Sequence, residues 1–184
     1  RYRTKDNDMT YKKTYRLTFI ILLTALLAGG SAMAQNKPHI GGSVFGGGNN
    51  AGVGINTNVN ISAGQIDGNV YGGGNLGSVG TYTTSNDMKT FTFTANTGEC
   101  DVTISGGTIG TGVVISADGT FANGNVYGAG KGLDVTYWCE KAMSYNTNVT
   151  INAGTVKGTV YGGGQIGRVE NNATVTIGAA TPES

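Results

Sequence analysis

One phrase of 17 residues recurs along this chain and limits what it can fold into. Its clearest copy, from Asn148 to Gly164, reads NVTINAGTVKGTVYGGG. The shared pattern is V-x-I-x-x-G-x-V/I-x-G-x-V-Y-G-G-G. Alternating apolar and polar residues are typical of a strand with one buried face, and glycine clusters are typical of turns. The phrase therefore predicts short strands separated by tight turns.

Copies of the phrase begin every 26 residues where nothing interrupts them. This spacing separates Val44 from Val70 and Val149 from Val175. The first copy, 40–48, matches only the second half of the phrase, and the fifth starts at Val175. A repeat of this length is typical of stacked architectures. We therefore predict an all-β fold, a parallel β-solenoid (β-helix) of about four to five 26-residue rungs.

Glycine abundance alone would also fit other classes of chain. The sequence has 33 glycines among 184 residues but only 2 prolines, and glycine does not occupy every third position, so a collagen helix is excluded. Valine, isoleucine and threonine recur at fixed places, which argues against disorder. Each unit divides into three strand-sized pieces, namely V-x-I, x-V-Y and a third apolar pair such as Leu76 and Val79 or Ile166 and Val169.

Stacked rungs place equivalent residues above one another, so the sequence predicts columns of like side chains. Val59, Val102, Val149 and Val175 should point inwards, as should Ile61, Ile104, Ile151 and Ile177. The residues between them should form an outward polar ladder of Asn60, Thr103, Thr150 and Thr176. A further column is aromatic: Phe45, Tyr71, Tyr127 and Tyr161. It is a candidate ligand-stacking platform for sugars, although aromatic ladders also simply pack rungs together, the reading that we favour.

The third and fourth copies contain insertions. Extra residues lie at about 80–100, 111–123 and 137–145. Insertions at repeat junctions fit loops that project from one side of a stacked array. Any specific function is therefore expected in these three segments.

The first 34 residues are typical of an export signal. A basic stretch, 12–16, precedes an apolar run, 17–28, that is too short to span a bilayer comfortably. Ala32 and Ala34 supply the small residues that signal peptidase needs. We predict cleavage between Ala34 and Gln35. An uncleaved membrane anchor is the alternative.

Three segments follow from this interpretation. Residues 1–8 precede the first Met and are read as an upstream artefact, 9–34 as the signal peptide, and 35–184 as a glycine-rich repeat domain truncated at its C-terminus. The repeat domain contains six Lys or Arg and nine Asp or Glu, which gives a net charge of −3. Such a mildly acidic body with scattered cations offers nucleic acid no electrostatic footprint.

Two cysteines, Cys100 and Cys139, each lie in an insertion shortly before a V-x-I strand. In an oxidising compartment they form a candidate disulfide, with two unpaired thiols as the alternative. The sequence has no C-x-x-C and no Cys/His cluster. We therefore predict no metal site and no cofactor.

Candidate catalytic groups are sparse. The single histidine, His39, lies four residues beyond the predicted mature N-terminus, which argues against a Ser-His-Asp or Cys-His arrangement. Acid pairs suited to glycoside hydrolysis stay open. Asp67, however, falls in an Asp-Gly turn, and Glu99, Asp101 and Asp118 are equally explained as solvated loop charges or weak Ca²⁺ ligands. The glycine runs match neither a phosphate loop nor a dinucleotide fingerprint.

A signal peptide followed by copies of V-T-I-x-x-G-x-V-x-G-x-V-Y-G-G-G resembles the long glycine-rich VYGGG-repeat proteins exported by Bacteroidetes. These are similar to the β-helices of adhesins and autotransporter passengers. The resemblance covers about residues 40–179. It implies a secreted or outer-surface protein, and no catalytic residues transfer from it.

Two classes of function remain, together with a distant third. We expect an exported structural or adhesive repeat protein that displays loops for attachment, with a host glycan, matrix or cell-surface component as its partner. The alternative is a carbohydrate-active β-helix enzyme, a polysaccharide lyase or hydrolase. An ice-binding array is less favoured, because the threonine ladder is mixed with Asn60 and only one residue wide. Self-association through an uncapped solenoid end is also expected.

Overall fold

The chain divides into two compact units, Arg1–Asn36 and Lys37–Ser184. A computed structural model describes residues of the second unit only, namely 37–87, 89–115, 117, 121–134 and 141–178. The predicted signal peptide, its cleavage site at Ala34 and Gln35, and Cys139 therefore lie outside the described residues. In the described part of the chain, no helix is long and apolar enough to cross a membrane.

The described residues are all-β, without a helix, and most of their strands are parallel. The expected all-β class is confirmed at this level. The strands are β1 (His39–Ile40), β2 (Val44–Phe45), β3 (Thr57–Ile61), β4 (Gln65–Ile66), β5 (Val70–Tyr71), β6 (Tyr82–Thr84), β7 (Phe91–Phe93), β8 (Glu99–Ile109), β9 (Val126–Tyr127), β10 (Asn146–Val156), β11 (Val160–Tyr161) and β12 (Ala173–Ile177).

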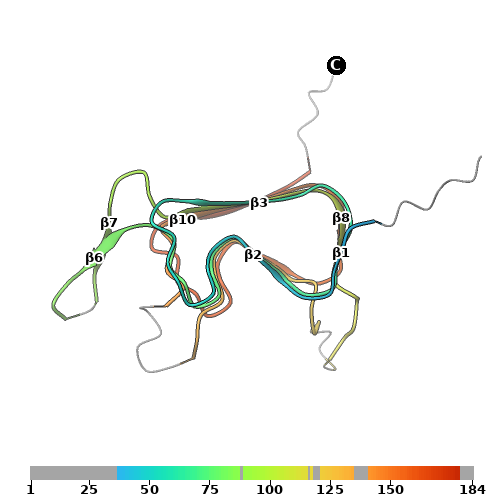
Figure 1. Ribbon diagram of the computed structural model, residues 1–184, viewed down its shortest axis with the longest axis horizontal. Coiled ribbons are helices and arrows are strands. Elements are labelled where there is room, and N and C mark those ends of the chain that lie inside the picture. Colours follow the sequence, from blue (N-terminus) through green and yellow to red (C-terminus); the bar gives the residue numbers. More distant parts are fainter. Residues whose placement is uncertain (1–36, 88, 116, 118–120, 135–140, 179–184) are drawn as a thin grey trace, which may run out of the picture. The chain divides into compact units, whose positions relative to one another are not determined.

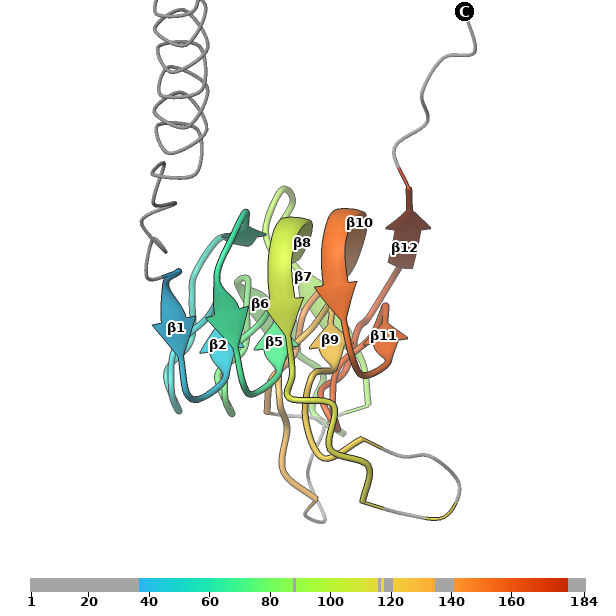
Figure 2. The same ribbon diagram turned by 90° about the vertical axis from the view of Figure 1, so that its right-hand side faces the viewer.

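Equivalent segments of successive copies pair in two parallel sheets. The larger sheet runs β1-β4-β8-β10-β12, with β3 also paired to β8, and the smaller runs β11-β9-β5-β2. Figure 2 shows both sheets following the same order, from β1 and β2 to β12 and β11. The registers reproduce the sequence repeat, since Val44 pairs with Val70 and Val149 with Val175. Copies separated by insertions stay in register too, as Val59 pairs with Val102.

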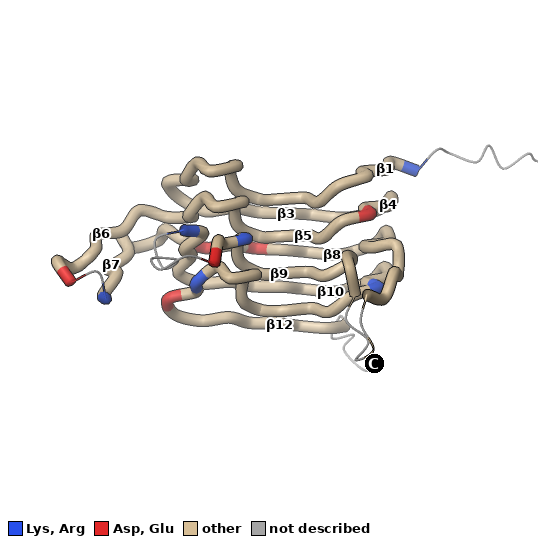
Figure 3. The backbone as a smooth tube through the Cα atoms, turned by 90° about the horizontal axis from the view of Figure 1, so that it is seen from below, with Lys and Arg blue, Asp and Glu red and all other residues tan. Residues whose placement is uncertain are grey.

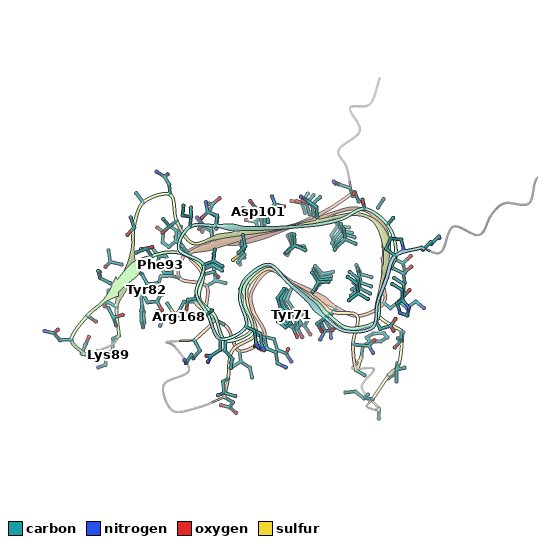
Figure 4. All side chains as sticks on the ribbon, viewed as in Figure 1. Tyr71, Tyr82, Lys89, Phe93, Asp101 and Arg168 are labelled. Atoms are coloured by element: carbon teal, nitrogen blue, oxygen red, sulfur yellow. The ribbon has the colours of Figure 1, made fainter. Side chains whose placement is uncertain are left out.

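The predicted apolar columns form the core between the two sheets. Val59, Val102 and Val149 are buried in register, and they pack with Val70 and Val126 of the smaller sheet in one cluster. Each buried aliphatic side chain contributes roughly 1.5–3 kcal/mol. Figure 4 shows these columns between the layers of backbone. The predicted outward ladder is also in register, with its members exposed or half-buried: Asn60, Thr103, Thr150 and Thr176.

The glycine triplets lie where the backbones of successive copies approach most closely. A methyl group added to Gly72 would overlap the carbonyl oxygen of Gly128, and one added to Gly128 would overlap that of Gly162. None of these three glycines has a positive φ. Close approach of the copies, rather than a left-handed backbone, therefore explains why glycine stands at Gly72 and Gly128.

A ladder of polar side chains joins the copies just before each V-Y strand. The Oγ of Ser43 accepts a hydrogen bond from the backbone N–H of Asn69 (3.0 Å). The Oδ1 of Asn69 accepts one from the N–H of Asn125 (2.9 Å), and the Oδ1 of Asn125 accepts one from the N–H of Thr159 (2.8 Å). Side chains thus satisfy backbone donors that the turns between strands leave unpaired.

The predicted third strand of each unit does not form. Leu76 and Ile166 adopt positive φ values of 61° and 65°, a left-handed conformation that cannot continue an extended strand. This segment contributes only isolated bridges, such as Val53 to Val79 and Ser144 to Val169. The expectation that the third apolar pair forms a strand was therefore wrong, because this pair lies at a turn. The second copy nevertheless has three strands, β3, β4 and β5.

The insertions include fewer residues than the sequence predicted. The first forms an antiparallel hairpin, β6–β7, which projects from the stacked copies in Figure 1. Glu99 and Cys100, placed in that insertion by sequence, begin β8 instead. The second insertion has one antiparallel bridge, Val114 to Phe121. In the third insertion, residues 135–140 are outside the described range. After them, the backbone pairs with the second copy again, since the carbonyl of Met143 accepts a hydrogen bond from Val79 N–H (2.7 Å).

Alanine substitution at Gly72 tests the close approach of the copies. We expect Gly72→Ala to lower the free energy of unfolding by about 1–3 kcal/mol or more, since the methyl group meets backbone that cannot rotate away. Urea denaturation followed by circular dichroism measures the loss.

The matched control is Gly163→Ala, where a methyl group would have nothing within 4 Å. The equivalent residue of the third copy, Ala129, already carries that methyl group and is fully buried. We expect stability within about 0.5 kcal/mol of the parent. Equal losses at Gly72 and Gly163 would contradict the role of the first triplet glycine.

Candidate functional site

An open groove of about 470 Å³ lies between the turns of the first two copies and the hairpin β6–β7. Turn residues, most of them small, line one part of it, namely 50–54, 76–78 and Gly80, and Tyr82 and Lys141 line it as well. Among the described residues that line it, Lys141 is the only charged one. The groove therefore offers backbone groups, hydroxyls, one aromatic ring and one positive charge.

Two left-handed turns of successive copies line the groove. Asn50 and Leu76 occupy equivalent turn positions, with φ values of 56° and 61°. A methyl group on Gly77 would overlap the carbonyl oxygen of Ala51, so no side chain can grow there. The N–H of Asn50 donates to the carbonyl of Asn75 (2.7 Å). Backbone contacts between the copies therefore hold these turns in place.

An aromatic cluster anchors the hairpin beside the groove. The ring centroids of Tyr82 and Phe93 are 5.0 Å apart, and those of Phe93 and Tyr145 are 5.3 Å apart. The guanidinium of Arg168 lies 5.0 Å from the centroid of the buried Phe91 ring, in cation–π geometry. Figure 4 shows Tyr82 and Phe93 on the hairpin with Arg168 beside them. Rings from three segments thus hold the Tyr82 side of the groove.

The hydroxyls at the groove are already close to one another. Ser78 Oγ and the Tyr82 hydroxyl are 3.3 Å apart, and Ser78 Oγ also accepts from the N–H of Met143 (3.1 Å). Tyr82 keeps part of its surface exposed and Lys141 is exposed. These groups can donate and accept hydrogen bonds toward a bound polar molecule.

The predicted aromatic column is present, with nearly parallel rings 4.5–4.9 Å apart: Phe45, Tyr71, Tyr127 and Tyr161. Tyr71 and Tyr127 are 2% and 8% exposed, and neighbouring rings cover both their faces. Burial raises the pKa of Tyr127 to about 12. A sugar cannot reach the covered faces of Tyr71 and Tyr127. These two central rings therefore pack between copies. Ligand stacking stays a prediction only for the end rings, of which Tyr161 is 45% exposed.

The acidic residues named from sequence that the structure describes do not line the groove. Asp67 contacts His39 (2.9 Å) near the start of the larger sheet, and this hydrogen bond lowers the pKa of its carboxyl. Glu99 and Asp101 lie in β8 rather than in a loop, which corrects their interpretation as loop charges. Asp118 is outside the described residues. Within the described ranges, no group of three or more His, Cys, Asp or Glu side chains could hold a metal ion.

Cys100 is an interior residue of β8. It pairs in register with Thr57 and Thr147, whose hydroxyls donate to the carbonyl oxygens of Gly72 and Gly162. Burial raises the pKa of its thiol to about 11. Its predicted place in a projecting loop is therefore wrong. Because Cys139 lies outside the described residues, their pairing stays a prediction.

The sequence contained a signal for the burial of Cys100 but none for the groove. Aligning TNVNI, CDVTI and TNVTI would have shown that Cys100 replaces an inward threonine of the repeat. The groove gave no such signal, because its lining includes small residues that two copies contribute together. Comparisons of the chain with protein-family models, curated proteins and solved structures found no match. The functional argument therefore depends on the geometry of the chain itself.

Alkylation of the Cys139→Ser variant tests the burial of Cys100. At pH 8, a pKa of about 11 leaves roughly one thiol in 1,000 ionised, and the side chain has no exposed surface. We expect iodoacetamide to modify the variant only after denaturation, as read by mass spectrometry. Rapid modification of the folded variant would contradict the assignment. A parent chain that resists alkylation even when denatured would show that its two thiols are paired.

Proposed function

We propose that this chain is an exported structural or adhesive repeat protein, built as a parallel β-solenoid, that binds a polar surface ligand beside its first insertion. The solenoid is supported by in-register parallel pairing between successive copies of one 26-residue unit. Its export is supported by the sequence pattern of residues 9–34. Together these favour display at the outer cell surface or release from the cell.

The groove is the observation that carries the binding proposal. Two turns that backbone contacts hold in place line it together with an anchored hairpin, so ligand binding would order few side chains and lose little entropy. Tyr82, Ser78 and Lys141 together provide an aromatic ring, a hydroxyl and a cation. Hydroxyl-rich molecules that carry a carboxylate or sulfate match this set. We therefore favour an acidic glycan of a host surface or matrix as the ligand class.

Binding to an array of neutral and acidic glycans tests the proposal. We expect Lys141→Gln to weaken binding of acidic glycans about fivefold, since an exposed charge contact contributes up to about 1 kcal/mol. Lys89→Gln is the control, because it removes the same charge from the hairpin outside the groove. Figure 4 shows Lys89 at the far end of the hairpin.

Three results would weigh against the groove. Binding that falls equally in the two lysine variants would indicate general attraction of anions. Binding that is unchanged in Lys141→Gln would place the ligand elsewhere. Absence of any glycan signal in the parent would remove the glycan as the ligand class.

One observation supports the alternative, a carbohydrate-active enzyme. Glu99 and Asp101 share the outer face of β8, where they accept hydrogen bonds from Asn146 (3.1 Å) and Asn148 (2.9 Å). Two carboxylates on one face could act as an acid and base pair. That face is a sheet surface, and neither residue lines the groove, so we rank this function second.

Polysaccharide breakdown by the parent and by the double variant Glu99→Gln, Asp101→Asn separates the two functions. We expect no release of reducing or unsaturated ends by either protein, since neither carboxylate lines the groove described above. Activity in the parent that disappears in the double variant would favour the enzyme. The glycan array is independent of this assay.

A further inference from the structure

Two charged residues of the fourth copy stand where earlier copies have small ones. The equivalent segments read Gly-Val-Gly at 52–54, Ser-Val-Gly at 78–80 and Arg-Val-Glu at 168–170. The first two segments supply residues that line the groove, whereas Arg168 and Glu170 do not line it. The packing of the repeat does not explain this change, because small residues suffice at the same positions in the first two copies.

Backbone hydrogen bonds connect the fourth copy to the segment that lines the groove. The N–H of Val79 donates to the carbonyl of Met143 (2.7 Å), and the N–H of Ser144 donates to the carbonyl of Arg168 (2.9 Å). Ser144 also forms a parallel bridge with Val169. The backbone at Arg168 therefore has a defined place relative to the groove.

Arg168 and Glu170 form an ion pair that is partly buried. Nη2 of Arg168 lies 2.8 Å from Oε2 of Glu170, and the two side chains are 30% and 19% exposed. The Oε2 atom is itself buried and has no hydrogen-bond partner among the described residues. A buried carboxylate oxygen requires a counter-charge, so Glu170 restricts where the guanidinium of Arg168 can lie.

The guanidinium in turn contacts the rings of the hairpin. Its carbon lies 5.0 Å from the centroid of the Phe91 ring, which is buried. The rings of Phe91 and Tyr82 meet edge to face with centroids 5.9 Å apart, and Tyr82 lines the groove. A planar guanidinium stacks well on an aromatic face. Contacts therefore run from Glu170 through Arg168 and Phe91 to Tyr82, and Figure 4 shows Arg168 beside the hairpin.

The hairpin depends on contacts of this kind. Its strands, β6 and β7, have three residues each, and a two-stranded hairpin is at best marginally stable alone. Tyr82 pairs with Phe93, and Phe91 follows two residues along on the same face, while Thr83 and Thr92 alternate with them and are exposed. Contacts of the aromatic face therefore determine where Tyr82 lies.

We propose that Arg168 and Glu170 are positioning residues for the groove. Their ion pair holds β6 and β7 so that Tyr82 stays beside the turns of the first two copies. The pair does not touch the ligand and acts through Phe91 and Tyr82. A binding site lined by the first two copies thus depends on two side chains of the fourth. This proposal rests on the ligand binding proposed above.

The main test is the double variant Arg168→Gln, Glu170→Gln of the full chain, which we call the pair variant. It leaves the net charge unchanged and leaves no buried carboxylate without a counter-charge. Unchanged net charge is essential, because Figure 3 shows most of the charged residues gathered at the end of the sheets that bears β6 and β7. The matched control is Lys131→Gln, Asp134→Asn, since both of these residues are exposed and neither lines the groove.

Two measurements are made on each protein. Calorimetric titration with a heparin hexasaccharide, which carries carboxylates and sulfates, gives the affinity. Hydrogen exchange of the ligand-free protein, followed by mass spectrometry, reports on the hairpin without any ligand. We expect the pair variant to bind about two- to fivefold more weakly, the factor that an exposed cation–π contact supplies. Amides of β6 and β7 should exchange faster, with β8 and β10 unchanged, and the control should match the parent.

A double-mutant cycle with Tyr82→Ala tests the route of action. If the pair acts through the Tyr82 ring, it has nothing left to position once that ring is removed. We therefore expect the pair substitutions to cause no further loss of affinity in the Tyr82→Ala background. A further loss of the same two- to fivefold size would overturn the proposal, because the pair would then act independently of Tyr82.

A second variant keeps the test valid if the pair variant fails to fold. Arg168→Lys retains a counter-charge for Glu170 but loses the planar group that stacks on Phe91. We expect changes in the same direction and of smaller size, namely weaker heparin binding and faster exchange in β6 and β7. Parent-like values for both measurements in a folded Arg168→Lys protein would overturn the proposal.

The remaining outcomes separate this proposal from the proposed function. Unchanged exchange in β6 and β7 of the pair variant would overturn the positioning role, whether or not heparin binds. Faster exchange with parent-like affinity would show that binding does not need the hairpin in place, and equal losses in the pair variant and the control would point to a general effect of charge. Absence of heparin binding by the parent would instead count against the groove as an acidic-glycan site.

Discussion

The close approach of backbone between successive copies is the constraint on which the rest of this structure depends. At Gly72 and Gly128 the copies lie so near that a methyl group would overlap a carbonyl oxygen of the next copy. That spacing lets parallel strands keep their register across insertions, and register brings valine over valine and ring over ring. The hydrophobic core is thus a consequence of how closely the copies stack.

The same repetition explains where specific binding can arise. The aliphatic and aromatic side chains of the columns contact equivalent residues of neighbouring copies, so their surfaces are occupied by packing. The aromatic column illustrates this, because Tyr71 and Tyr127 are covered by each other and by neighbouring rings. Inserted segments have no equivalents in neighbouring copies, so packing between copies does not cover them. The hairpin β6–β7 projects from the array, and its aromatic cluster holds Tyr82 beside turns of two different copies.

Burial also changes the meaning of residues that resemble functional groups. Cys100 and Thr147 occupy equivalent inward positions, and Cys100 is as enclosed as the threonine. Glu99 and Asp101, which alternate with it along β8, face the other side of the sheet and bond to asparagines of β10. The alternation of a strand therefore separates a buried sulfur from two half-buried carboxylates within three consecutive residues.

The sequence by itself determined the 26-residue period, the all-β class, the inward columns such as Val59 to Val149 and the existence of the ring column. These are local or periodic properties, and identical spacing guarantees identical neighbours. Tertiary structure alone decided that Leu76 and Ile166 turn rather than extend, and that Cys100 is interior. It also decided that small residues of two copies form a groove with Tyr82 and Lys141. Those features depend on backbone angles and on contacts between distant segments, which residue spacing does not specify.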